Sequence, residues 1–173
     1  TNFYDPNLKY SNESFIKNLV KKKKIIIGTV ANVNPVKGLS NFLGAVKKLS
    51  FYSNRIVFIV VGSIYNTQKN YYHDLINIIN KHKIKNFFFL GPRKDVRPLL
   101  KVMSIYVCSS NYESSPLSLW EAMSMKKAIV STDVGDVNKF ITNGINGYIV
   151  KKGNQGCLSK YLKKLIKNPK LRN

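Results

Sequence analysis

Short, continuous apolar runs alternate along the chain with segments whose apolar residues recur at helical spacing. Apolar, β-branched runs of this kind are typical of strands that are buried on both faces of a parallel sheet. They predict strands at 25–30, 55–61, 86–90, 104–108, 128–131 and 148–150. Apolar stripes predict helices near 39–49, 72–79, 96–103, 116–125 and 158–165. This alternation predicts an α/β fold, a doubly wound parallel sheet of the Rossmann-like type.

The chain of 173 residues has the length of one ordinary domain. We expect residues 25–173 to form that domain and residues 1–24 to form a lead-in and interdomain hinge segment. Residues 1–6 lack the pattern of a signal peptide. They also lack an initiator Met, so we expect the chain to be a piece of a longer protein.

In a doubly wound sheet, ligands bind at the carboxyl ends of the strands. One of the loops expected there contains Glu113, and the helix that follows contains Glu121. Between them, Pro116 suits the first helical position. The free amides and the dipole of a helix start bind phosphate, and carboxylates accept hydrogen bonds from sugar hydroxyls. The strand, loop and helix around the two carboxylates therefore indicate a nucleotide-sugar site. Without that context, a pair of carboxylates would more often be only a helix-dipole complement or a cap.

A second candidate group is Lys37-Gly38, which lies between the first strand and the first helix. A Lys at this position can meet a phosphate over the helix start. Neither a Walker loop nor a G-x-G-x-x-G fingerprint is present. On its own, Lys37 would be interpreted as a solvated residue before a glycine turn.

The formal net charge of +21 favours phosphate-rich partners. However, the abundance of Asn, Ile, Tyr and Phe is what AT-rich coding produces without selection for charge. The lysine runs at 21–24 and 160–170 are not interleaved with the aromatic residues or arginines that a single-strand binding groove uses. We therefore expect a mostly solvated basic surface and no nucleic-acid partner, with peripheral attraction to an anionic membrane as a secondary expectation.

The cysteines and histidines do not form a pattern that binds a metal. Cys108 and Cys157 are interpreted as structural thiols in a reducing compartment, and His73 and His82 as solvated side chains. We expect no metal site.

Four motifs occur in a fixed order: Asn-Pro-Val-Lys-Gly-Leu at 34–39, Phe-Leu-Gly-Pro-Arg-Lys-Asp-Val at 89–96, Glu113-x7-Glu121, and Ser-Thr-Asp-Val-Gly-Asp at 131–136. Together they resemble the C-terminal, donor-binding half of the retaining glycosyltransferases of GT-B architecture, in the "group 1" (family 4-like) family. The resemblance extends from about residue 25 to residue 167. It is more specific than any single motif.

The resemblance implies a role for each matching residue. Glu121 would accept hydrogen bonds from the ribose, and Glu113 would bind the donor sugar and stabilise positive charge at its anomeric carbon. Lys37 would neutralise the leaving phosphate. The remaining residues of the expected nucleotide site are Asn32, Gly91, Arg93, Ser114, Ser115, Pro116, Leu117 and Ser118, with the amides of Leu117 and Ser118 holding the diphosphate and the 91–93 loop flanking the base.

The implied reaction is the transfer of a hexosyl unit with retention, without a metal or another cofactor. A UDP-sugar is favoured over a GDP- or ADP-sugar, and the implied setting is cytoplasmic synthesis of surface polysaccharide or glycolipid, peripheral at the inner face of the membrane. The acceptor-binding domain would lie outside this chain, which alone would be inactive.

The sequence departs from the family pattern at several positions. Asn32 stands where many members carry an Arg that shares diphosphate binding, and Ser114 stands where they often carry Gly. Lys126 and Asn138 replace a common Gly and a common acidic residue. Two other functions remain open at this stage: a basic α/β module that binds nucleic acid, and another nucleotide-sugar enzyme such as an epimerase.

Overall fold

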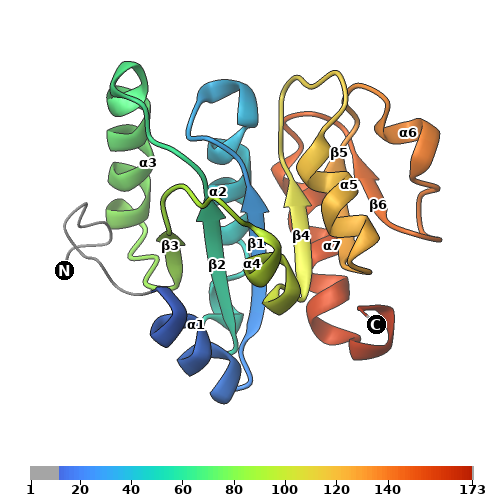
Figure 1. The fold of residues 1–173 in the computed structure, drawn as a ribbon, viewed down its shortest axis with the longest axis horizontal. Coiled ribbons are helices and arrows are strands. Elements are labelled where there is room, and N and C mark those ends of the chain that lie inside the picture. The colour runs from blue at the N-terminus through green and yellow to red at the C-terminus, as the bar shows by residue number, and fades with distance from the viewer. Residues whose placement is uncertain (1–11, 173) are drawn as a thin grey trace.

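The computed structural model describes residues 12–172, so most of the first half of the expected hinge segment lies outside the described residues. Its centre is one six-stranded sheet in which every paired neighbour is parallel (Figure 1). The strand order is β3-β2-β1-β4-β5-β6. The strands are β1 Ile25–Val30, β2 Ile56–Val61, β3 Phe87–Phe89, β4 Ile105–Cys108, β5 Ala128–Thr132 and β6 Tyr148–Val150. The predicted fold class is confirmed.

Helices cover both faces of this sheet (Figure 1). One face is covered by α2 Leu39–Lys47, α3 Lys69–Lys81 and α7 Gln155–Lys167. The other is covered by α1 Asn12–Lys21, α4 Arg97–Val102, α5 Leu117–Ser124 and α6 Val137–Phe140. Short 3-10 turns complete the connections: η1 Pro35–Lys37, η2 Ser50–Tyr52, η3 Asn66–Gln68 and η4 Pro169–Leu171. None of the helices in the described part of the chain has the length and apolar character that crossing a bilayer requires.

The strands divide their side chains between two apolar layers because successive residues of a strand point to opposite faces. In β1, Ile25 and Ile27 pack toward α2 and α7, while Ile26 packs on the opposite face. The first layer is anchored by Phe42, whose ring contacts Phe58 and Phe87 edge-on with centroids 5.8 and 5.6 Å apart. Burial on both faces is why these strands read as continuous apolar runs in the sequence.

The expected hinge segment contains a helix that packs on the sheet. Ile16 and Leu19 of α1 are buried in the second layer, and the ring of Phe15 lies 5.0 Å from that of Phe88. The domain boundary after residue 24 stays a prediction.

Two local features differ from the sequence expectation. Pro116 is the N-cap of α5, with ψ at 87°, and the helix begins one residue later than predicted, at Leu117. The four-residue helix α6 was not predicted, because a single turn is too short to show a helical period.

Three turns that lead from a helix into a strand share an unusual backbone conformation. Lys23, Lys83 and Lys126 have φ of 50°, 51° and 55°. In each turn the next residue reaches back to close the helix end, as when the N–H of Ile84 donates to the Ile79 carbonyl at 3.0 Å. Helices commonly end on such a left-handed residue, and glycine is the usual choice because it has no Cβ to clash.

Replacing Lys83 by glycine should therefore stabilise the domain. We expect Lys83→Gly to raise the free energy of unfolding by about 1 kcal/mol, measured by urea denaturation. Lys85→Gly is the matched control, because Lys85 is also exposed but is not one of the positive-φ residues. Equal stability of the two variants would contradict the assigned backbone strain.

Candidate functional site

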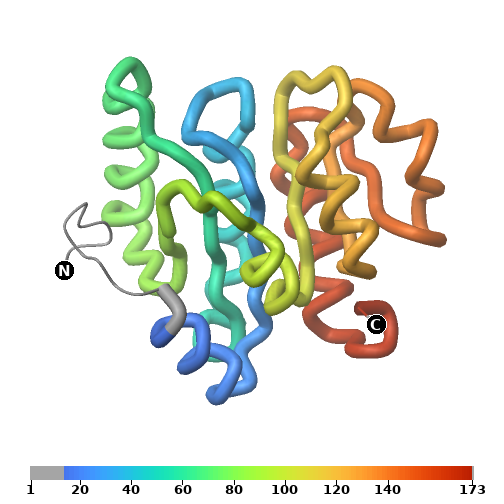
Figure 2. The backbone as a smooth tube through the Cα atoms, viewed as in Figure 1, coloured from blue at the N-terminus to red at the C-terminus, as the bar shows by residue number. Residues whose placement is uncertain are grey.

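A cavity of about 430 Å³ opens at the carboxyl edge of the sheet, where the strand order reverses between β1 and β4. Reversal points of this kind are where doubly wound sheets bind ligands, because the flanking loops diverge there. The loops after β1 and β4 lie side by side at this edge (Figure 2). The cavity is lined by Val30, Ala31, Asn32, Lys37, Val61, Gly62, Ser63, Pro92, Arg93, Val96, Glu113, Ser115, Pro116, Leu117 and Ser118.

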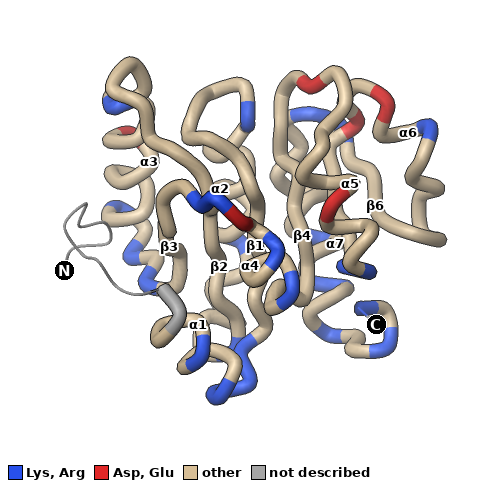
Figure 3. Tube along the Cα trace, viewed as in Figure 1, with Lys and Arg blue, Asp and Glu red and all other residues tan. Residues whose placement is uncertain are grey.

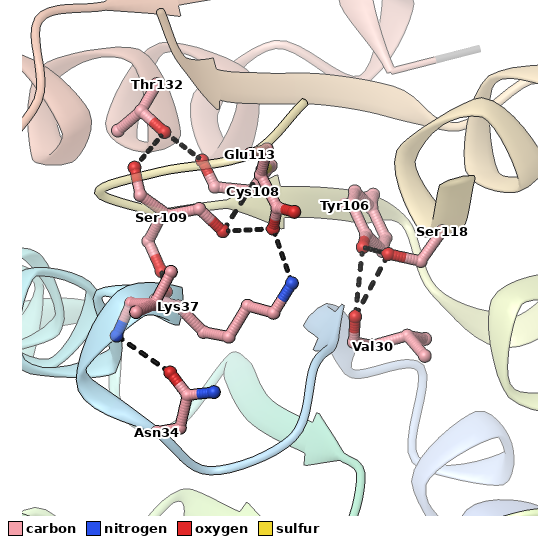
Figure 4. Close-up of polar contacts among 11 residues, drawn as sticks. Val30, Asn34, Lys37, Tyr106, Cys108, Ser109, Glu113, Ser118 and Thr132 are labelled. Carbon is pink, nitrogen blue, oxygen red and sulfur yellow. Dashed lines mark hydrogen bonds and ion pairs between the residues drawn. The ribbon is translucent and has the colours of Figure 1, made fainter. Parts of the chain in front are cut away.

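Lys37 and Glu113 form an ion pair across this cavity (Figure 4). The Nζ atom of Lys37 lies 2.7 Å from Oε1 of Glu113, and the two side chains are 28% and 15% exposed. The hydroxyl of Ser110 donates to the same oxygen at 2.8 Å. Oε1 therefore has two donors, whereas Oε2 has none among residues 12–172 and can accept a hydrogen bond from a ligand.

The loop that presents Lys37 is tied down on both sides. The side chain of Asn34 accepts a hydrogen bond from the N–H of Val36 at 2.8 Å and caps η1. The N–H of Asn111 donates to the Val36 carbonyl at 2.7 Å, and the hydroxyl of Ser109 donates to the Lys37 carbonyl at 3.0 Å. The residues next to β4 thus fix the position of Lys37.

Gly38 permits the close approach of these two loops. Its φ is 60°, and a Cβ at this position would lie 2.0 Å from the Ser109 carbonyl oxygen. The glycine after Lys37 is therefore required by the contact with the β4 loop, beyond its role in the turn.

The loop that presents Glu113 is held by the loop after β5. Thr132 donates its hydroxyl to the Ser110 carbonyl at 2.7 Å, and the N–H of Asp136 donates to the Ser114 carbonyl at 3.1 Å (Figure 4 shows the first of these contacts). Gly135, with φ of 54°, approaches so closely that a Cβ would lie 2.0 Å from the Ser114 oxygen. The three loops therefore interlock around Glu113.

The start of α5 presents backbone donors to the same cavity. The first hydrogen bonds of the helix run from Leu119 and Trp120 to the Pro116 carbonyl, at 2.9 and 3.3 Å. The N–H groups of Leu117 and Ser118 precede any intrahelical acceptor, as at every helix start. The positive end of the α5 dipole therefore faces the cavity, which Lys37 also lines. This combination suits an anion.

A buried tyrosine fixes the start of α5 against the end of β1. Tyr106 donates its hydroxyl to Ser118 Oγ at 2.7 Å, and Ser118 donates to the Val30 carbonyl at 3.0 Å (Figure 4). Burial raises the pKa of Tyr106 well above its usual value, so this hydroxyl remains a proton donor at neutral pH.

Asn32 and Arg93 also line the cavity. The side-chain oxygen of Asn32 accepts a hydrogen bond from the N–H of Ser63 at 2.9 Å, which joins the loops after β1 and β2. Arg93 donates through Nη1 to the Pro92 carbonyl at 2.6 Å, whereas its buried Nη2 has no hydrogen-bond partner among the described residues. Burial lowers the pKa of Arg93. Arg93 is thus a second cation in the cavity, and its Nη2 can donate a hydrogen bond to a ligand.

The structure brings most of the residues predicted for the site into one cavity. Those that line it are Asn32, Lys37, Arg93, Glu113, Ser115, Pro116, Leu117 and Ser118. Glu121 lies exposed in the second turn of α5, and neither it, Gly91 nor Ser114 is among the lining residues. Their functional roles stay predictions.

The residues that orient the charged pair were not predictable from the sequence. Ser109 directly follows β4 and Thr132 ends β5, whereas Ser110 and Asn111 lie in the Glu113 loop. Small polar residues at the carboxyl end of a strand were the available signal, but such residues occur in most loops. Only the fold shows which of them meet.

Comparison with known proteins identifies the family. A family model described as "Glycosyl transferases group 1" matches residues 11–173, and the chain belongs to this family of glycosyltransferases. The resemblance inferred from the four motifs is confirmed.

Two curated relatives illustrate the range of similarity. The N,N'-diacetylbacillosaminyl-diphospho-undecaprenol alpha-1,3-N-acetylgalactosaminyltransferase of Campylobacter jejuni is 31% identical over 160 residues, which cover 92% of this chain and 40% of that protein. The UDP-Gal:alpha-D-GlcNAc-diphosphoundecaprenol alpha-1,3-galactosyltransferase of Escherichia coli is 26% identical over 137 residues, which cover 76% of this chain and 34% of that protein. The chain therefore spans two fifths or less of the length of these relatives.

Solved structures of GT-B glycosyltransferases share the fold. Anabaena HepE in complex with UDP and glucose superposes with a TM-score of 0.83 at 21% identity, over 92% of this chain and 44% of HepE. The C-terminal domain of the group 1 protein LpcC from Francisella tularensis gives 0.82 at 23% identity, over 90% of this chain and 84% of that domain.

The interlocking of the loops can be tested at Gly135. Gly135→Ala should lower the free energy of unfolding by about 1–3 kcal/mol, because it adds backbone strain and drives a methyl group into the Glu113 loop. Gly144→Ala is the control, since Gly144 also has positive φ, 86°, but has open space around it. Urea denaturation measures both. A Gly135→Ala loss no larger than that of Gly144→Ala would contradict the close contact.

Proposed function

We propose that this chain is the nucleotide-sugar-binding domain of a retaining, metal-independent glycosyltransferase that uses a UDP-sugar in preference to a GDP- or ADP-sugar. The observation that carries the proposal is the Lys37–Glu113 ion pair beside the open start of α5. A nucleotide sugar has a diphosphate next to a polyol, and this site has a cation and free amides next to a carboxylate. The relative from E. coli is named as a transferase that uses UDP-Gal, and HepE binds UDP.

In the proposed complex, the diphosphate lies against the amides of Leu117 and Ser118, and Lys37 neutralises the phosphate that leaves. The amides are fixed by the start of α5 before the donor arrives, so only Lys37 has to turn when negative charge develops on the leaving group. Glu113 faces the donor sugar through Oε2 and stabilises positive charge at the anomeric carbon. Because Oε1 is held by Ser110, Glu113 keeps its orientation when Lys37 turns toward the phosphate.

The nucleoside would extend away from Lys37. Gly91 and Arg93 flank the base, while Glu121 accepts hydrogen bonds from the ribose hydroxyls. Because Glu121 is exposed on α5, the ribose would lie along the outer side of that helix start rather than deep in the cavity.

For the whole protein, we propose a second domain that binds the acceptor and supplies any general base, so that this chain alone binds the donor but does not transfer the sugar. We place the enzyme in the cytoplasm, at the inner face of the membrane, in the synthesis of surface polysaccharide or glycolipid. Support comes from the names of two relatives, which specify diphospho-undecaprenol acceptors.

The direct test is calorimetric titration of the chain with UDP, GDP and ADP at low and high salt. The proposal predicts saturable one-to-one binding, strongest for UDP, that survives at high salt because the cavity supplies hydrogen bonds as well as charge. Binding that vanishes with salt and does not distinguish the bases would contradict it.

The ribose assignment is tested at Glu121. We expect Glu121→Ala to weaken UDP binding by about 1.5–3 kcal/mol, the contribution of a hydrogen-bonding group that carries a charge. Asp133→Ala is the control, because Asp133 is an exposed acid in another loop of the same edge and tests the effect of removing negative charge alone. Equal affinities of the two variants would exclude the ribose contact.

The sugar-facing role is tested at Glu113. Glu113→Gln keeps an oxygen for Ser110 and Lys37 but replaces Oε2 by an amide nitrogen. It should leave UDP affinity nearly unchanged and weaken binding of the intact UDP-sugar, because Oε2 contacts only the sugar. Ser110→Ala should give the same selective loss in smaller measure, and Ser110→Thr, which keeps the hydroxyl, should restore binding. Equal losses for UDP and the UDP-sugar in calorimetry would show that Glu113 acts on the nucleotide or on folding instead.

A further inference from the structure

The cavity at the carboxyl edge contains a cation that has no acidic partner among residues 12–172. The charged residues that line the cavity are Lys37, Glu113 and Arg93. Lys37 and Glu113 form an ion pair at 2.7 Å, so together they add no net charge to the cavity, whichever way Lys37 turns. The positive charge that remains for a ligand is therefore that of Arg93.

The acid nearest to Arg93 along the chain is already paired. Between β3 and the start of α4, basic residues lie on both sides of a single acidic residue (Figure 3). That residue, Asp95, accepts hydrogen bonds from the guanidinium of Arg97 at 2.8 Å on Oδ1 and 2.9 Å on Oδ2. A bidentate pair of this kind uses both carboxylate oxygens. Asp95 is therefore committed to Arg97, and Arg93 is left without a counter-charge.

The hydrogen bonds of Arg93 give no structural reason for its presence. Its Nη1 donates to the carbonyl of the preceding residue, Pro92, at 2.6 Å, and a bond to the adjacent residue does not hold the loop against another element. Its Nη2 is buried without a hydrogen-bond partner among the described residues. Buried donors in proteins are nearly always paired, so an unpaired guanidinium nitrogen on a cavity wall indicates that a ligand supplies the acceptor.

The fold fixes the loop that presents this side chain. The N–H of Val33 donates to the Ser63 carbonyl at 2.9 Å, which joins the loops after β1 and β2. The N–H of Gly62 donates to the Gly91 carbonyl at 3.1 Å, which joins the loops after β2 and β3. Gly91 has φ of 70°, and a Cβ at this position would lie 4.0 Å from Nη1 of Arg93. The left-handed turn at Gly91 therefore lies directly beside the guanidinium.

We propose that the guanidinium of Arg93 binds the phosphate group attached to the nucleoside and is the cation that balances the charge of a nucleoside diphosphate in this cavity. The proposal rests on the proposed function, in which the 91–93 loop flanks the base. Because the base lies against that loop, its side chain reaches the phosphate next to the ribose. Lys37, which is paired with the sugar-facing Glu113, is left for the phosphate next to the sugar.

An anion explains the contacts of Arg93 better than the base does. A guanidinium that only stacked on the base would leave Nη2 without an acceptor, whereas two oxygens of a phosphate match the planar fork of an arginine. Asn32, which lines the same cavity, also favours an anion. Its side-chain oxygen accepts from the N–H of Ser63, so its NH₂ group is the part that can donate to a ligand.

The test is the affinity of the chain for inorganic pyrophosphate, UMP and UDP, measured by amide NMR titration at one ionic strength. Pyrophosphate has no base, and UMP has only the phosphate next to the ribose. Arg93→Gln should weaken all three ligands by a similar factor, between about tenfold and a hundredfold, because it removes a charged hydrogen-bond donor that each of them uses. Arg93→Lys, which keeps the charge but not the planar fork, should bind all three more tightly than Arg93→Gln.

Lys94→Gln is the charge-matched control, because Lys94 is an exposed cation of the same loop that does not line the cavity. It should change each affinity less than about twofold, as expected for a solvated charge. Equal losses for Lys94→Gln and Arg93→Gln would overturn the proposal by showing a diffuse effect of charge. A loss that spares pyrophosphate would assign Arg93 to the nucleoside, and one that spares UMP would assign it to the other phosphate. Either result would also overturn the proposal.

The same titrations separate this proposal from the proposed function. Binding of UDP that Arg93→Gln leaves unchanged would overturn the role of Arg93 alone. Binding of pyrophosphate that depends on Arg93, with no preference for UDP over pyrophosphate, would overturn the donor site and leave Arg93 as a residue that binds an anion. If the unmodified chain bound none of the three ligands, both proposals would be overturned.

Discussion

The ion pair between Lys37 and Glu113 is the interaction on which the geometry of the candidate site depends. It joins the loops after β1 and β4, whose strands are adjacent only because the strand order reverses at β1. Both charges are partly withdrawn from water, and each would be costly to leave without its partner. The surrounding contacts serve this pairing: Asn111 and Ser109 hold the Lys37 loop, and Thr132 and Gly135 hold the Glu113 loop.

In this arrangement, some hydrogen-bonding groups hold the loops of the site in place, and others remain available to bind a ligand. Oε1 of Glu113 is occupied by Ser110 and Lys37, while Oε2, the amides of Leu117 and Ser118, and Nη2 of Arg93 have capacity left. The groups that remain available are those a donor with a diphosphate and a sugar would use.

The fold and the two principal charges were predictable from the sequence because both depend on local patterns. Continuous apolar runs marked all six strands, and Lys37 and Glu113 followed strands that had been predicted. Their direct contact was not predictable, since it depends on strand order. Ser110 could not be distinguished from other loop serines without the contact to Glu113. Asn32 was expected to belong to the nucleotide site. It lines the cavity, and its side-chain oxygen accepts a hydrogen bond from the N–H of Ser63, a contact between two loops that the sequence did not indicate.

The most direct test of the proposed donor site is an amide NMR titration of the ¹⁵N-labelled chain with UDP. We predict that the largest shifts occur at Leu117 and Ser118, with smaller ones in the Lys37 and Glu113 loops and none in the turn at 82–86. Shifts concentrated in the turn at 82–86, or the absence of shifts at the start of α5, would contradict the proposed donor site.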